Sequence, residues 1–289
     1  MTEARLRSVE VDGLRVSYFE RGKGPLVLCL HGFPDTAHTF LPTLEVLASR
    51  GFRAIAPSMR GYPPTSLAPD GDYSIARLGK DALALAEALG AARFAIVGHD
   101  WGATAGYAAA ALAPERVAKL ATAAVPHLRV QRATLDQARR SWYIGFFQLP
   151  VVPERVVRRN GFAFLDKLWR DWSPGWRYTP SDIAPVKEAL ASDAALAAAL
   201  GYYRALPRSL ADAENRRVAF GRLSVPALTF AGVDDGCMGV RSFDRQSDAF
   251  VGPMRTVRLE GAGHFMHREV PDRFHRELVE FLGSARDLR

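Results

Sequence analysis

Short apolar runs alternate along most of the chain with longer segments in which apolar residues return every three or four positions. Runs of four to six residues that are bounded by polar turns predict strands. The first two runs alternate with polar residues on either side of Asp12-Gly13, as the strands of an antiparallel hairpin do. The later runs are continuously apolar, which is typical of strands buried on both faces of a mainly parallel sheet. The predicted strands are residues 8–11, 14–19, 26–30, 53–56, 94–97, 120–124, 227–231 and 256–259.

Helical patterns occupy the segments between these runs. The apolar residues from Ile75 to Leu89 are spaced by three or four positions, so they form one stripe along a helix. Phe274, Leu278 and Leu282 form a similar stripe in the segment 271–282, which begins with Pro-Asp. Regular alternation of strands and helices predicts an α/β fold with a mostly parallel central sheet and helices on both of its faces.

This alternation stops between about Arg129 and Arg217. The segment contains every tryptophan except Trp101, several prolines and helical patterns, but no strand pattern. A chain of 289 residues is long enough for one large domain with an insertion, or for two domains. We interpret 129–217 as a helical cap inserted between the two parts of one α/β core, 1–128 and 218–289.

Composition and charge narrow the class of protein. Apolar residues make up 48% and charged residues 24% of the chain, as in globular proteins. The net charge of +7 comes from arginines that are spread along the chain, which indicates a solvated basic surface and no nucleic-acid partner. Two cysteines, Cys29 and Cys237, make neither a disulfide framework nor a metal cluster. The absence of a long apolar run or a signal-peptide core predicts a soluble cytoplasmic protein without a membrane partner.

The sequence GHDWGA, residues 98–103, joins a predicted strand to a small-residue segment that favours a helix. Gly98 and Gly102 stand two positions on either side of Asp100, which suits a sharp turn whose close backbone contacts exclude side chains. A serine at the centre of such a turn indicates an esterase, but here the central group is a carboxylate. The positive end of the following helix favours its ionised form. Helix capping is the alternative role for Asp100, although a cap does not require both glycines.

Two further polar segments follow in an informative order. AGVDDG (231–236) comes directly after one predicted strand, and GAGHFMHRE (261–269) comes after the last. Nucleophile, then acid, then histidine is the chain order of the α/β-hydrolase arrangement. We therefore expect His264, in its Gly-x-Gly-His loop, to be the catalytic base. We expect His267 to be a surface residue at the start of the last helix.

The acid that orients the histidine has two candidates. Asp234 and Asp235 are adjacent in the loop after the strand. The spacing Gly-x-x-Asp, counted from Gly232, favours Asp235 and leaves Asp234 as a turn residue.

The segment HGFP (31–34) follows the third predicted strand. In the same architecture this loop donates a backbone N–H to an oxyanion hole, which we assign to Phe33, with the N–H of Trp101 as the second donor. We expect His31 to order the loop through hydrogen bonds without reacting. Pro34 is a candidate for a cis peptide bond.

Together these motifs resemble those of the α/β-hydrolase-fold epoxide hydrolases, over essentially the whole chain. HGFP resembles the family's HGxP loop, GHDWG its nucleophile turn and GAGHF its catalytic-histidine loop. The family also carries a helical cap with two tyrosines that bind the epoxide oxygen. SWYIGFFQLP resembles the first cap motif and LGYYRAL the second. This resemblance implies that role for Tyr143 and Tyr203, and the adjacent Tyr202 is the alternative that fits the second motif less well.

The resemblance implies that the protein converts an epoxide and water to a vicinal diol. Asp100 would open the epoxide and form an ester with it, while Tyr143 and Tyr203 donate to the ring oxygen. His264, oriented by Asp235, would then activate water to cleave the ester. Such a reaction needs no cofactor and no metal, and no spacing typical of metal ligands appears in the sequence. MRGYPPTS (59–66) departs from the family's usual Arg-Gly-Tyr-Gly, which leaves the shape of the substrate open.

Two other functions are compatible with parts of this pattern. A haloalkane or haloacid dehalogenase uses the same aspartate nucleophile, but Phe33 stands where haloalkane dehalogenases typically carry Asn, and two tyrosines suit an alkoxide better than a halide. A binding protein without activity would have no need of Asp100 together with its acid, base and tyrosines. The aromatic residues of the predicted cap indicate a small apolar epoxide as the substrate. We expect a monomer or a homodimer.

Overall fold

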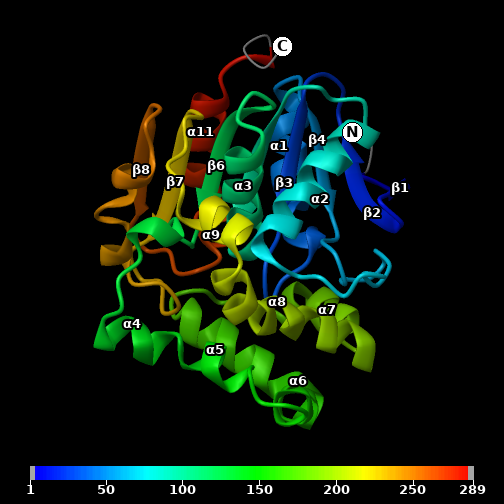
Figure 1. Cartoon of the computed structure of the whole chain (residues 1–289), viewed down its shortest axis with the longest axis vertical. Coiled ribbons are helices and arrows are strands. Elements are labelled where there is room, and N and C mark those ends of the chain that lie inside the picture. Colours follow the sequence, from blue (N-terminus) through cyan, green and yellow to red (C-terminus); the bar gives the residue numbers. More distant parts are fainter. Residues whose placement is uncertain (1–3, 286–289) are drawn as a thin grey trace.

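A single sheet of eight strands forms the centre of the protein, whose computed structural model describes residues 4–285 (Figure 1). The strand order is β1-β2-β4-β3-β5-β6-β7-β8. Only β2 runs antiparallel to its neighbours, and every other pair is parallel. The strands are β1 (Arg5–Val11), β2 (Leu14–Arg21), β3 (Leu26–Leu30), β4 (Arg53–Pro57), β5 (Phe94–His99), β6 (Val117–Ala123), β7 (Ala227–Gly232) and β8 (Met254–Leu259). All eight predicted strands, the hairpin and the fold class are confirmed.

Helices cover both faces of this sheet. The α-helices of the core are α1 (Leu41–Ser49), α2 (Ile75–Ala88), α3 (Trp101–Leu112), α9 (Ala213–Phe220), α10 (Met266–Glu269) and α11 (Pro271–Leu282). Figure 1 shows α2 and α9 in front of the sheet, and both contact α3. On the other face, apolar residues of α1 and α11 pack against the strands; Leu44 and Leu278 are fully buried there. The two helices predicted from apolar stripes, near 75–89 and at 271–282, are confirmed.

A second layer of helices lies across the carboxyl ends of the parallel strands (Figure 1). It consists of α4 (Leu135–Arg140), α5 (Trp142–Phe146), α6 (Val152–Trp172), α7 (Pro180–Ala189) and α8 (Asp193–Ala211). α6 is interrupted between Arg159 and Phe162, where the backbone leaves helical geometry. We refer to α4–α8 as the cap helices. The domain boundaries proposed from the sequence, 129 and 217, remain predictions.

Two strands, β1 and β6, begin three residues before their predicted starts, and β6 begins at Val117. Lys119 breaks the apolar run, yet it lies within the strand, and its Nζ donates to the carbonyl oxygens of Phe281 and Leu282 at 2.9 Å each. These carbonyls end α11, where a cation is favourable because the helix dipole is negative there. Within residues 4–285, no helix is both long and apolar enough to cross a membrane.

Candidate active site

The turn between β5 and α3 holds Asp100 in a backbone conformation that is rare for a residue with a side chain. Its φ is 53° and its ψ is −117°, outside the common regions for L-residues. The flanking glycines make this turn possible. A Cβ at Gly98 would lie 2.3 Å from the carbonyl oxygen of Gly102, and one at Gly102 would lie 2.0 Å from that of Leu30. Larger residues at either position would force the strand and the helix apart, so the turn requires both glycines.

The carboxylate of Asp100 is buried and held from one side by the HGFP loop. Its Oδ1 accepts a hydrogen bond from the amide of Phe33 at 2.8 Å. A Cβ on Gly32 would lie 2.2 Å from Asp100 Oδ1 and 2.6 Å from the amide nitrogen of Trp101. The two amides predicted for the oxyanion hole therefore lie close to the same carboxylate oxygen. The Phe33–Pro34 peptide bond is cis.

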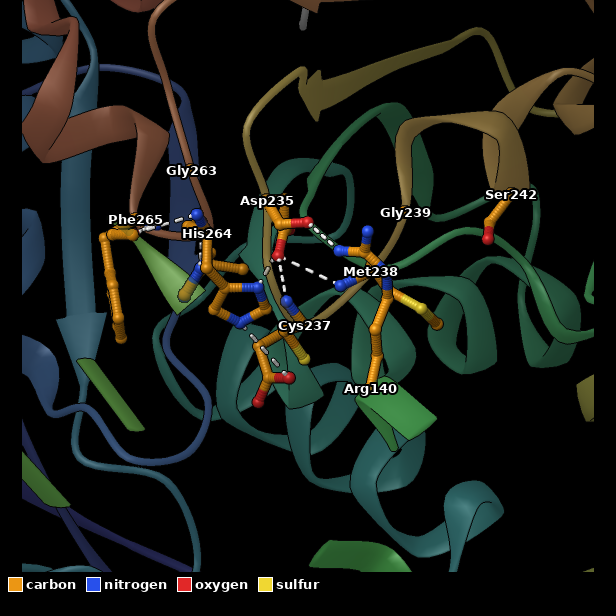
Figure 2. A network of polar contacts seen from close by, with 12 residues as sticks. Arg140, Asp235, Cys237, Met238, Gly239, Ser242, Gly263, His264 and Phe265 are labelled. Atoms are coloured by element: carbon orange, nitrogen blue, oxygen red, sulfur yellow. Dashed lines mark hydrogen bonds and ion pairs between the residues drawn. The ribbon is translucent and has the colours of Figure 1, made fainter. Parts of the chain in front are cut away.

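His264 lies between Asp100 and the second acid. Its Nδ1 lies 3.0 Å from Asp235 Oδ2, and its Nε2 lies 3.7 Å from Asp100 Oδ2. The other oxygen of Asp235 accepts hydrogen bonds from the amides of Cys237 and Met238 (Figure 2). Asp234, in contrast, is exposed. The geometry therefore favours Asp235 over Asp234 as the acid that orients the imidazole.

A cap residue holds the loops that carry His264 and Asp235. The carbonyl oxygen of Trp172, the last residue of α6, accepts hydrogen bonds at 3.0 Å from the amides of both Gly236 and His264. The next residue, Ser173, accepts a second bond from the His264 amide through its Oγ at 2.9 Å. His264 is thus positioned by the cap as well as by the sheet.

The electrostatic environment of His264 favours its charged form. Burial alone would lower the pKa of the imidazole, but the carboxylate of Asp235 and the nearby charge of Asp100 raise that pKa well above its ordinary value of 6.5. The charged form of His264 is therefore favoured while Asp100 is ionised. It loses one of the two stabilising charges if Asp100 becomes esterified, which would return the imidazole toward its neutral, basic form.

The raised pKa predicts a pH-dependent stability difference for an Asp235→Asn variant. A histidine whose folded-state pKa exceeds the unfolded value stabilises the fold fully below about pH 6.5, and loses this effect as the pH rises through the folded pKa. The variant should thus lose more in Tm at about pH 6 than at about pH 10. Thermal unfolding of both proteins across this range measures the difference, and an equal loss at every pH would contradict the assigned pKa.

Tyr143 and Tyr203 come from the cap helices α5 and α8 and lie next to each other. Their ring centroids are 5.7 Å apart, and Tyr203 also contacts the rings of Phe33 and Trp101 at 5.5 and 5.1 Å. Burial, and to a smaller extent the charge of Asp100, raises the pKa of both phenols well above 10. Both hydroxyls are consequently protonated and able to donate.

The two hydroxyls differ in their partners. Tyr143 Oη lies 3.3 Å from the sulfur of Cys237, whereas the hydroxyl of Tyr203 is buried without a hydrogen-bond partner among the described residues. The hydroxyl of Tyr202, the alternative candidate in the second cap motif, instead donates to the carbonyl oxygen of Arg60 at 2.7 Å. A buried hydroxyl without a partner is costly in a folded protein, so that of Tyr203 is available for a substrate oxygen.

Two further histidines can be compared with their predicted roles. His31 accepts a hydrogen bond from the amide of Met59 through Nε2 at 3.0 Å, and its Nδ1 lies 3.0 Å from the carbonyl oxygen of Gly32. This arrangement is the loop-ordering contact that was expected. The prediction for His267 is wrong, because its side chain is buried beside Thr39 and stacked on Phe40.

Sequence reasoning missed two residues that contact the site. Trp172 packs against the rings of Tyr143 and His264, with centroid distances of 5.0 and 4.9 Å. The Cys237 side chain contacts the Tyr143 hydroxyl, and Cys237, Asp235 and His264 each offer one possible metal-ligand atom within 4.8 Å of the others. No local motif identifies either residue; the position of Cys237 two residues after the acid was the only signal.

Known proteins resemble this chain over almost its full length. Residues 25–270 match a family model described as the alpha/beta hydrolase fold. Epoxide hydrolase A of Mycobacterium tuberculosis is 30% identical, with 96% of each chain covered. A fluoroacetate dehalogenase from a Burkholderia species is 29% identical, with 97% of this chain and 94% of that protein covered. Among solved structures, epoxide hydrolase VrEH1 from Vigna radiata is similar with a TM-score of 0.82 at 26% identity, covering 97% of this chain and 98% of that one.

Proposed function

The chain belongs to the α/β-hydrolase-fold epoxide hydrolase family, and from this premise we propose that it hydrolyses a small apolar epoxide to a vicinal diol through an ester on Asp100. One observation carries the proposal. A carboxylate stands at the centre of the turn between β5 and α3, and the buried hydroxyl of Tyr203 near it has no hydrogen-bond partner within residues 4–285. A carboxylate can displace oxygen from a saturated carbon, and a phenol can protonate the oxygen that leaves.

The first step is the opening of the epoxide. Asp100 Oδ1 is held by the amide of Phe33, so Oδ2 is the oxygen that attacks the ring carbon from behind. The C–O bond of the ring breaks, and Tyr143 or Tyr203 gives its proton to the departing alkoxide. The product of this step is an ester between Asp100 and the substrate, together with a tyrosinate that the solvent or the imidazolium of His264 reprotonates.

The second step is hydrolysis of that ester. Loss of the Asp100 charge lowers the pKa of His264, whose neutral imidazole then removes a proton from water. The water attacks the carboxyl carbon of Asp100, and the amides of Phe33 and Trp101 stabilise the oxyanion on Oδ1. Removing one such donor typically costs about 3 kcal/mol in the barrier. The bond between the carboxyl carbon and the ester oxygen Oδ2 then breaks, His264 returns the proton to that oxygen, and the diol leaves while Asp100 retains one oxygen from water.

The proposed ester mechanism is tested by tracing whether the oxygen atom of water enters the diol or Asp100. In a single turnover in ¹⁸O-labelled water, we expect the first diol to carry no label and Asp100 to acquire it, because water attacks the enzyme's carboxyl carbon. Mass spectrometry of the diol and of the peptide that contains Asp100 measures both. Label in the first diol would show that water attacks the epoxide directly, and would overturn the ester mechanism.

The roles of the tyrosines predict a defined kinetic defect. Tyr143→Phe and Tyr203→Phe should each slow ester formation by about 100-fold, within the range of positioned acid catalysis. Stopped-flow measurement of the alkylation step reports this rate. Tyr202→Phe is the matched control: it removes a neighbouring hydroxyl that bonds to Arg60, so it should cost about 1 kcal/mol of stability and leave alkylation unchanged. Equal rates in all three variants would remove the tyrosines from the mechanism.

Dehalogenation is the second candidate, since a relative is named as a fluoroacetate dehalogenase. The phenols of Tyr143 and Tyr203 favour an epoxide, because the leaving oxygen needs a proton whereas a halide does not. A panel of terminal and disubstituted epoxides, run beside haloalkanes and haloacetates with halide detection, separates the two activities. Diol formation without halide release is the expected result.

A further inference from the structure

A second group of buried polar side chains lies directly beside the catalytic residues. It consists of Asp35, His99 and His267, whose exposed fractions are 2%, 1% and 1%; we call it the buried cluster. One possible metal-ligand atom from each residue lies within 4.8 Å of the others, and His99 Nδ1 lies 3.8 Å from Asp35 Oδ2. Asp35 Oδ2 and the Nδ1 atoms of both histidines have no hydrogen-bond partner in the part of the chain that the structure describes.

The remaining polar atoms of these side chains are already engaged. Asp35 Oδ1 accepts a hydrogen bond from the amide of Thr36 at 2.8 Å. His99 Nε2 lies 2.9 Å from the carbonyl oxygen of His264. A carbonyl can only accept, so Nε2 carries the proton and the lone pair of His99 is on Nδ1. His267 Nε2 lies 2.5 Å from the hydroxyl of Thr39.

This arrangement matches the surroundings of metal-binding histidines. Such a histidine commonly donates its second ring N–H to a carbonyl or another oxygen, which fixes the tautomer and orients the free nitrogen toward the metal. His99 has this arrangement with the carbonyl of His264, and His267 has a hydroxyl partner in Thr39. Two imidazoles and one carboxylate are also ligands suited to a divalent transition metal.

A bound proton, water molecule or ion is expected at buried polar atoms that lack hydrogen-bond partners, because native proteins satisfy nearly all such atoms. A proton on Asp35 would supply one donor, and a water molecule would supply two. A single cation accepts lone pairs from all three residues. We propose that the buried cluster binds one divalent transition-metal cation, with Zn²⁺ as the reference ion.

The spacing of the cluster is wider than that of a closed zinc site. Ligand atoms around a tetrahedral zinc lie about 3.4 Å apart, given metal–ligand distances of about 2.0 to 2.2 Å. The separation of 3.8 Å between Asp35 Oδ2 and His99 Nδ1 requires a contraction of a few tenths of an ångström, and the distances to His267, which lie within 4.8 Å, require a contraction of at most about 1.4 Å. Side-chain rotation supplies a movement of this size without a change in the fold.

The position of the cluster gives the cation a structural role. Asp35 follows Phe33 by two residues, His99 directly precedes Asp100, and His267 follows His264 by three residues. One cation would therefore join the loops that carry the oxyanion-hole amide, the nucleophile and the base. The site is closed to solvent and offers no substrate access, so the metal would be acquired during folding and would hold the loops together.

The experiment measures metal binding and does not depend on the proposed hydrolase activity. The full chain is unfolded in guanidinium chloride with a chelator, then refolded with Zn²⁺, with Co²⁺ or with chelator alone, and desalted. We expect about one metal per chain by elemental mass spectrometry and a higher Tm after refolding with Zn²⁺. The Co²⁺ protein should absorb in the visible range as a site with nitrogen and oxygen ligands does.

Variants locate the metal. Asp35→Asn and His267→Gln should weaken metal binding by more than about 100-fold, the upper range for loss of a supporting group around a metal. His127→Gln is the matched control, because His127 is also buried with a free Nε2 but belongs to no ligand cluster among residues 4–285. It should bind metal as the original protein does.

A Cys237→Ser variant tests the competing group formed with Asp235 and His264. Metal retained by Cys237→Ser and lost from Asp35→Asn supports the proposal. The reverse pattern, or an original protein that takes up no metal on refolding, overturns it. Should a cluster variant fail to refold, the metal content and Co²⁺ spectrum of the original and Cys237→Ser proteins still decide the outcome.

Discussion

Replacing Asp100 with asparagine is expected to lower kcat by at least about 10⁴-fold, as the loss of a covalent catalyst does in hydrolases with a comparable triad. The amide has nearly the same shape, and its oxygen can still accept the hydrogen bond from Phe33. It carries no charge, however, so it cannot displace oxygen from a saturated carbon. Single-turnover assays with intact-mass detection should find neither diol nor ester.

Asp234, an exposed neighbour of Asp235, provides the matched control. Asp234→Asn makes the same chemical change at an exposed residue that lies next to Asp235, and its activity should stay within about twofold of the original because surface substitutions are usually near neutral. The Asp100→Asn protein should retain its fold, which circular dichroism and the Tm can verify. Substantial diol formation by a folded Asp100→Asn protein would exclude Asp100 as the nucleophile.

Much of the fold could be predicted because local patterns agree with the long-range arrangement. The strands β3, β5 and β7 are fully buried and apolar throughout, apart from a few terminal or hydroxyl-bearing residues, so hydrophobicity alone identifies them. The start of β6 was missed because Lys119 reaches the end of α11, a partner more than 160 residues away that no local window contains.

In the site, too, local spacing predicts some residues, whereas contacts with distant parts of the chain determine the position of others. Asp100 and His264 could be proposed as site residues because backbone geometry demands glycines at fixed spacings around the turn and the loop. The surface position predicted for His267 failed because its burial depends on Thr39 and Phe40, from a distant part of the chain. Sequence spacing also could not indicate the buried cluster, whose members come from the loop after β3 (Asp35), the end of β5 (His99) and the short helix α10 (His267).

Replacing His264 with glutamine should stop the reaction after its first step. Glutamine cannot accept a proton from water, so ester hydrolysis should slow by about 10⁴-fold or more. Asp100 keeps its charge, and the tyrosines keep their protons, so the epoxide can still open. The variant incubated with an epoxide should therefore gain the mass of one substrate molecule on the peptide that contains Asp100.

Accumulation of the ester on Asp100 would distinguish ring opening from ester hydrolysis more clearly than a loss of turnover does. Asp235→Asn serves as the comparison: its imidazole can still act as a base, although it is less well oriented, so the ester should form and then decay slowly. A burst of one equivalent followed by no further consumption is expected for His264→Gln. If His264→Gln neither forms the ester nor consumes epoxide, while its fold is intact, then the imidazolium of His264 is needed for ring opening itself. The proton for the leaving oxygen would then come from His264, and the tyrosines would only orient the ring.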